Sequence, residues 1–124
     1  MIKDFVADKI TYVVDREANC YEISFSDHRD EPEQYVIAQR AFFFDKQDIE
    51  LGMDTYYFEY ADQSSSGYGI CSTVKLERDR AVFKIKNGAL DVITEIHIKF
   101  RNTMSVKSWD ELAEVFEKIF DRRT

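Results

Sequence analysis

Hydrophobic and polar residues alternate along most of the chain, the pattern of strands that bury one face. The alternation predicts strands over residues 5–15, 20–26, 34–44, 54–61, 67–77, 81–86 and 94–101. Residues 27–33, 45–53 and 62–66 interrupt it and predict loops. In the last strand, Ile96, Ile98 and Phe100 share one face while Glu95 and His97 point the other way, as in a half-buried antiparallel sheet.

Local features refine this pattern at three places. The consecutive phenylalanines Phe42, Phe43 and Phe44 predict a strand end that is buried on both faces or tucked under another element. Gly52 is a natural site for a positive φ angle. The pair Gly67 and Gly69 indicates a bulge or a close neighbour that leaves no room for a side chain.

Near the end of the chain the apolar spacing becomes helical. Ser108 and Glu111 form a capping box that predicts the helix start, with acidic residues in the first turn. Arg122 and Arg123 follow the last turn, where cations suit the helix dipole. One side of the helix is apolar and consists of Trp109, Leu112, Val115, Phe116, Ile119 and Phe120. We therefore expect an α+β fold, an antiparallel sheet of about six to seven strands with a C-terminal amphipathic helix packed on one face.

Length and composition place few further limits. A chain of 124 residues has the size of one domain, so residues 1–124 are expected to form a single α+β domain. No apolar run approaches the roughly 20 residues of a membrane span. Lys3, Asp4, Asp8 and Lys9 interrupt the apolar residues near the start, so no signal segment is predicted. We expect a cytoplasmic protein.

The charge is negative and unevenly distributed. The net charge is −7, and residues 1–62 alone carry 15 acidic and 6 basic residues, or −9. This sign argues against binding to nucleic acid or to anionic membranes. Four acids fall within residues 27–33 and another four within residues 45–54. These stretches are either solvated loops that keep the protein soluble or a negative surface for a basic partner.

Side chains that carry chemistry form no catalytic or metal-binding motif. Cys20 and Cys71 lie in strand-like runs and are predicted to be small buried hydrophobic residues. His28 lies among Asp27, Asp30 and Glu31, where it is a solvated loop residue or, alternatively, a metal ligand. His97 is predicted to lie on the surface, and Ser64, Ser65 and Ser66 to form a turn.

The acids of residues 45–54 do not have the spacing of an EF-hand. No catalytic residue, cofactor or metal is therefore predicted, and a binding protein is favoured. Two alternatives stay open, a small-ligand or metal-dependent hydrolytic domain that uses His28, and an oligomeric scaffold with an open sheet edge.

A central group of segments is more specific. These segments are Gln39-Arg40, Phe44-Asp45-Lys46-Gln47-Asp48, Leu51-Gly52-Met53-Asp54-Thr55-Tyr56-Tyr57 and Gly67-Tyr68-Gly69. They resemble the tenth immunity-protein family of bacterial polymorphic toxin systems. The resemblance implies a non-enzymatic cytoplasmic antidote, carried beside a secreted or contact-delivered toxin, that blocks the toxin by binding it.

The charge pattern suggests where a toxin would bind. An acidic surface can mimic the phosphates that a basic nuclease binds, so the expected partner is a cognate toxin domain, such as a basic nuclease. The antidote itself is expected to be a monomer or homodimer. Gly52, Asp54 and Tyr56 have an alternative interpretation as purely structural residues that turn the chain between two strands. The predicted toxin-binding residues are Asp27, Asp30, Glu31, Glu33, Asp45, Asp48, Glu50 and Asp54, with Tyr57 as an aromatic anchor.

Overall fold

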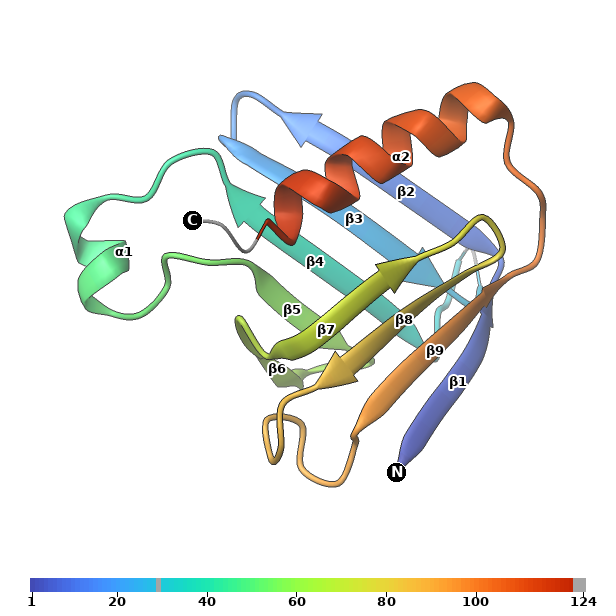
Figure 1. Cartoon of the computed structure of the whole chain (residues 1–124), viewed down its shortest axis with the longest axis horizontal. Coiled ribbons are helices and arrows are strands. Elements are labelled where there is room, and N and C mark those ends of the chain that lie inside the picture. Colours follow the sequence, from blue (N-terminus) through green and yellow to red (C-terminus); the bar gives the residue numbers. More distant parts are fainter. Residues whose placement is uncertain (29, 122–124) are drawn as a thin grey trace.

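The protein folds into two sheets and two helices (Figure 1). The computed structural model describes residues 1–28 and 30–121. One sheet contains β1 (Ile2–Ala7), β7 (Cys71–Leu76), β8 (Arg80–Ile85) and β9 (Glu95–Phe100), in the order β1-β9-β8-β7. The other contains β2 (Lys9–Asp15), β3 (Cys20–Ser26), β4 (Tyr35–Ala41), β5 (Tyr57–Tyr60) and β6 (Asp62–Tyr68), in that order. The helices are α1 (Lys46–Glu50) and α2 (Val106–Ile119).

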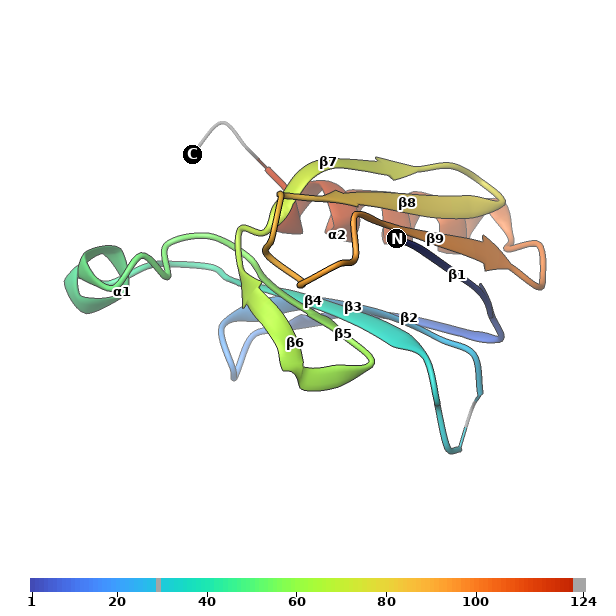
Figure 2. The same cartoon turned by 90° about the horizontal axis from the view of Figure 1, so that it is seen from below.

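The elements form two layers (Figure 2). The five-stranded sheet is one layer, and the four-stranded sheet lies over part of it. Helix α2 lies beside the four-stranded sheet and contacts β2, β3 and β4 (Figure 1). The predicted α+β class and the C-terminal helix on one sheet face are confirmed, whereas the single sheet is wrong.

The predicted strand 5–15 is divided at Asp8 into β1 and β2, which belong to different sheets. Phe5 and Ala7 point into the core from β1, but Ile10 and Tyr12 do so from β2, so the inward parity changes across Asp8. β1 pairs in parallel with β9, which also corrects the expected all-antiparallel arrangement. The Asp8 carboxylate lies 3.0 Å from Nε of Arg101 and fixes this corner between the layers.

A second division follows β6. Strand β6 ends at Tyr68, so the predicted strand 67–77 is divided there. Gly69 adopts a φ of +61°, and a Cβ at this position would lie 3.0 Å from Cγ2 of Thr55. Ile70 and Cys71 are then both buried, so the alternation shifts before β7 continues in the other sheet. The predicted loop 62–66 is the polar beginning of β6, and the three serines lie in this edge strand.

Helix α2 begins one turn before the predicted capping box. Ser105 is the N-cap, and its hydroxyl accepts a hydrogen bond of 3.1 Å from the backbone N–H of Ser108. The first turn therefore holds no acidic residue, contrary to the prediction, and Lys118 lies in the last turn. Arg122 and Arg123 lie outside the described residues. The predicted apolar side is confirmed, with Trp109 half-buried and the other five residues buried.

Aromatic rings join the two layers around Phe83 of β8. Its ring centroid lies 5.2 Å from that of Phe58 and 6.2 Å from that of Phe25, both on the five-stranded sheet. It also lies 6.0 Å from Phe116 and 5.8 Å from Phe120 at the end of α2. The core therefore lies between the inner face of the five-stranded sheet and the layer formed by the other sheet and α2.

Candidate functional site

The eight predicted acidic residues divide between two places. Those of residues 27–33 lie in the loop between β3 and β4, and those of residues 45–54 follow the other end of β4. Seven strand residues at about 3.3 Å each separate the two groups by roughly 20 Å. Figure 2 shows the two segments at opposite ends of the five-stranded sheet. The structure therefore does not gather the eight acids into one cluster.

In the β3–β4 loop, one acid is structural and three point to solvent. The Asp27 carboxylate accepts hydrogen bonds from the backbone N–H of Glu33, at 3.0 Å, and of Gln34, at 3.1 Å. Asp27 therefore closes the loop. Asp30, Glu31 and Glu33 are exposed, and none of the large exposed hydrophobic residues of the described chain lies in this loop.

The second group lies on a projecting segment, residues 42–55, which we call the α1 arm (Figures 1 and 2). β4 ends at Ala41, earlier than predicted. Phe42 packs against Tyr21 with ring centroids 4.6 Å apart, and the Arg40 guanidinium lies 5.3 Å from the Phe44 ring. Phe43 is 79% exposed, so the expected burial of all three phenylalanines is wrong.

Two arm acids build the short helix α1, where the sequence predicted a loop. A carboxylate oxygen of Asp45 accepts a hydrogen bond of 2.7 Å from the backbone N–H of Asp48. A carboxylate oxygen of Asp48 in turn accepts one of 3.1 Å from the backbone N–H of Asp45. This reciprocal capping box accounts for both acids. Gly52, with a φ of +71°, ends the turn as predicted. Glu50 and Asp54 remain exposed.

The α1 arm also exposes apolar side chains. Ile49 is 56% and Leu51 63% exposed, so together with Phe43 three large apolar side chains of the arm are left outside the core. A surface helix normally buries an apolar face, whereas α1 buries none of its residues. Exposed apolar residues with a charged rim are the usual anatomy of a protein–protein interface. Charge counting alone did not find these three residues.

Behind the arm lies a hollow of about 310 Å³ that includes Tyr57 in its lining. The Tyr57 hydroxyl donates a 2.6 Å hydrogen bond to Glu59, and its ring meets the edge of Tyr68 at 5.5 Å. Burial, and then the bond to Glu59, raise the pKa of Tyr57 above its ordinary value. Tyr57 is the one predicted residue on the sheet that lies beside the α1 arm.

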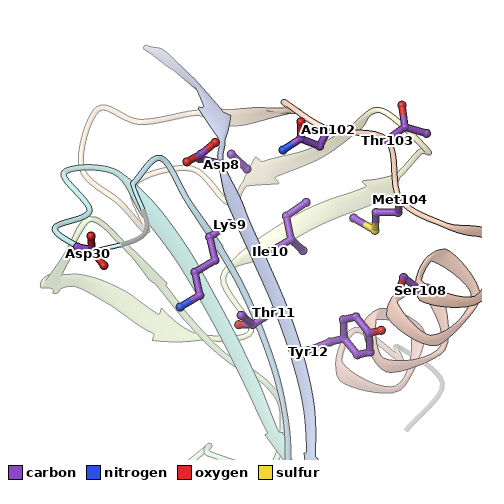
Figure 3. Close-up of a pocket in the computed structure, with 11 residues that line it drawn as sticks. Asp8, Lys9, Ile10, Thr11, Tyr12, Asp30, Asn102, Thr103, Met104 and Ser108 are labelled. Carbon is purple, nitrogen blue, oxygen red and sulfur yellow. The ribbon is translucent and has the colours of Figure 1, made fainter.

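A larger hollow of about 660 Å³ lies between β2 and residues 102–104 (Figure 3). In this view Ile10 and Tyr12 point toward α2, whereas Lys9 points to the opposite side of the strand. The Tyr12 hydroxyl donates to Glu111 at 2.9 Å, and Asp8 is paired with Arg101. The Tyr12–Glu111 bond joins β2 to α2, and the Asp8–Arg101 pair joins the corner between β1 and β2 to the residue after β9, so these two lining groups are already paired.

The remaining candidate groups are the two cysteines and the two histidines. Cys71 is buried as predicted, but Cys20 is only half-buried. His97 is half-buried and lies 3.0 Å from Glu95, which lowers the pKa of that carboxyl. His28 is exposed. Among residues 1–28 and 30–121, no three His, Cys, Asp or Glu side chains are grouped to hold a metal ion.

Several residues of the central segments hold the layers together. Arg40 is buried and donates hydrogen bonds to the carbonyls of Ile119, at 3.3 Å, and Asp121, at 3.0 Å, at the end of α2. The Tyr56 hydroxyl accepts from the Cys71 N–H at 2.9 Å and lies 3.3 Å from the Cys71 carbonyl. The sequence signal was the position of Arg40 in the alternating strand β4. An arginine on the inward face of a strand is unusual and indicates a structural role.

A family model for immunity protein 10 matches residues 6–107. The chain belongs to the immunity protein 10 family. This confirms the resemblance of the central segments and extends it over most of the chain. Immunity proteins neutralise a cognate toxin, so membership in the immunity protein 10 family identifies a toxin inhibitor and not an enzyme. No curated protein and no solved structure matches the chain. Neither helix in the described part of the chain has the length and apolar character of a membrane span.

Proposed function

We propose that this protein neutralises a basic cognate toxin domain in the cytoplasm by docking the α1 arm over the toxin's active site. The observation that carries the proposal is that one segment exposes three large apolar side chains, Phe43, Ile49 and Leu51, together with the acids Glu50 and Asp54. Binding energy at protein interfaces is concentrated in such apolar centres, while the charged rim contributes steering and specificity.

The mechanism is stoichiometric occlusion. The negative charge of residues 1–62 would attract a cationic cleft and raise the association rate to about 10⁸–10⁹ M⁻¹s⁻¹ at low salt. The exposed apolar side chains of the arm would then slow dissociation, because they leave water only in the complex. If the toxin is a nuclease, the arm carboxylates would occupy the positions of substrate phosphates.

The α1 arm is favoured over the β3–β4 loop by a difference in what surrounds the acids. Both segments are acidic, but only the arm combines its acids with exposed apolar side chains among the described residues. A solvated acidic loop gains little on binding, because a surface ion pair contributes about 0–1 kcal/mol.

Matched charge reversals test this choice. The first variant combines Glu50→Lys with Asp54→Lys, leaving Asp45 and Asp48 to cap α1. Its control combines Glu31→Lys with Glu33→Lys in the β3–β4 loop, which changes the net charge equally and leaves Asp27 in place. We expect the arm variant to weaken binding of the neighbouring-gene toxin domain about 100-fold and to abolish protection of co-expressing cells. The loop variant should lose less than tenfold.

The outcomes separate the alternatives. Equal losses in both variants would mean that overall charge, and not the arm, determines affinity. An arm variant that binds and protects like the wild-type protein would refute the arm as the docking site. Failure of the wild-type protein to bind or to protect would refute the proposed inhibition of this toxin. Isothermal titration calorimetry and growth of co-expressing cells measure the two readouts.

A further inference from the structure

The outer face of the five-stranded sheet is uncovered within the described part of the chain (Figure 2). Side chains alternate across a strand, and Val36, Ala38 and Phe58 point inward, so their neighbours point outward. Glu22 likewise lies next to the buried Ile23, and Tyr68 is paired with Tyr57, so both also point outward. We define the open face by six outward residues, Glu22, Tyr35, Ile37, Tyr57, Glu59 and Tyr68. Ile37 lies at its centre, opposite Ser24 of β3 and Glu59 of β5.

Hydrogen bonds hold the polar side chains of the open face in fixed positions. The Tyr35 hydroxyl donates to one oxygen of Glu59 and the Tyr57 hydroxyl to the other. The Gln39 amide donates to Glu22. A carboxylate has about four lone-pair directions, so Glu59 can still accept hydrogen bonds from a partner. The face is therefore organised before any partner arrives, which reduces the entropic cost of binding.

The composition of the open face suits protein recognition. Tyrosine gives a large rigid contact area at low entropic cost, which is why it is enriched in antibody paratopes. Carboxylates beside aromatic rings match an arginine side chain, whose guanidinium can bond to the acid and stack on the ring. The outer face of the other sheet has the opposite character, since Lys75, Lys84 and Lys99 are exposed there.

The size of the open face indicates that it works with the α1 arm. Five strands about 4.8 Å apart, with up to seven residues at about 3.3 Å each, present roughly 450 Å². A stable interface needs about 800 Å² per partner. The hollow lined by Gln39, Tyr57 and Tyr68 together with Phe44 and Met53 of the arm makes the two surfaces continuous.

We infer that the open face and the α1 arm form one docking surface, and that its occupant is an arginine-bearing surface of the cognate toxin. This inference rests on the proposed function and adds the sheet face to it. Ile37 and the tyrosines contact the toxin backbone and aliphatic stems, while Glu22 and Glu59 receive its guanidinium groups. The inner face of the same sheet is filled by the core.

Two substitutions, one on the outer face of each sheet, test the open face. Ile37→Lys places a cation opposite Glu59, so the fold tolerates it, but it repels a basic partner at the centre of the face. The matched control is Ile2→Lys on the outer face of the four-stranded sheet, which makes the same change in charge opposite Glu95. We expect Ile37→Lys to raise the Kd for the toxin domain at least 100-fold and Ile2→Lys to change it less than threefold.

A second variant covers the possibility that Ile37→Lys fails to fold. Tyr68 is 41% exposed at the end of the edge strand β6, and Tyr68→Ala should weaken binding about tenfold while the loss of its ring contact with Tyr57 lowers the melting temperature by only a few degrees. If the wild-type protein binds and folded Ile37→Lys and Tyr68→Ala bind equally well, the open face is refuted while the proposed function stands. If the wild-type protein does not bind, the proposed function itself fails.

Light scattering of the free protein tests the competing occupant, a second copy of this chain. A wild-type dimer that Ile37→Lys converts into a monomer would assign the open face to self-association and overturn the inference. A wild-type mass that Ile37→Lys leaves unchanged, together with loss of toxin binding, supports it.

Discussion

The two faces of the five-stranded sheet use neighbouring residues for different purposes. On the inner face, Arg40 closes the end of α2 and Tyr56 bonds to the first residue of β7. On the outer face, their neighbours Gln39 and Tyr57 bond to Glu22 and Glu59 and line the hollow beside the arm. The family motif therefore contains adjacent pairs in which one residue holds the layers together and the other is available to a partner. Resemblance to a family does not by itself distinguish the two.

The largest contrast is expected between Arg40→Ala and Gln39→Ala. Loss of Arg40 leaves the carbonyls of Ile119 and Asp121 without this charged donor and opens a space in the interior. We expect the free energy of unfolding to fall by about 3 kcal/mol. Gln39→Ala removes only its half-buried bond to Glu22 and should cost less than about 1 kcal/mol. Urea denaturation measures both values.

Toxin binding should reverse the order of these two variants. Folded Arg40→Ala loses a contact with the Phe44 ring of the arm but no side chain of the open face, so it should bind at most twofold more weakly, whereas Gln39→Ala should bind several-fold more weakly. A Gln39 variant that loses stability but keeps full affinity would contradict the division between the faces.

Removal of a single hydroxyl gives a smaller and cleaner contrast. Tyr56→Phe deletes the buried group that bonds to Cys71 across the layers, and we expect a loss of about 1–2 kcal/mol in unfolding free energy. Tyr57→Phe deletes a hydroxyl on the open face and should change stability by less than about 0.5 kcal/mol. Its effect should appear in the toxin Kd, as an increase of about fivefold. Equal effects of the two variants on unfolding free energy and on the toxin Kd would contradict the different roles of the two sheet faces.

Much of the fold could be predicted because one-sided burial leaves a clear period in the sequence. β3 matches its predicted range and β9 nearly does, since both strands alternate without interruption. The two-sheet arrangement was missed because strands that pass from one layer to the other look continuous in composition. Only the parity change at Asp8 and the adjacent buried residues Ile70 and Cys71 mark the crossings.

The candidate site was less predictable, because residues of the same type have different roles. Asp27, Asp45 and Asp48 bond to backbone N–H groups of their own segments, whereas Glu50 and Asp54 point to solvent. Counting charges treats all five alike. The phenylalanine run predicts burial of Phe43, because phenylalanine is more often buried than exposed, yet this side chain is 79% exposed.

The last prediction concerns how stability depends on pH through the hydroxyl of Tyr35 on the open face. Burial, and then the bond to Glu59, raise the pKa of Tyr35 to about 12 in the folded protein, compared with about 10 when unfolded. The folded state therefore favours the neutral phenol, and this contribution to stability is complete below pH 10 and is lost as the pH rises toward 12.

Tyr35→Phe removes that titration, so its unfolding free energy should fall less steeply between pH 10 and 12 than that of the wild-type protein. Tyr12, Tyr57 and Tyr60 also have raised pKa values and titrate in both proteins, so the difference between the two curves reports Tyr35 together with its coupling to Tyr57. A constant difference across pH 9–12 would show that the Tyr35 hydroxyl is not held by Glu59 in solution. The open face would then lack the ordered carboxylate that we assign to the toxin's arginine side chains.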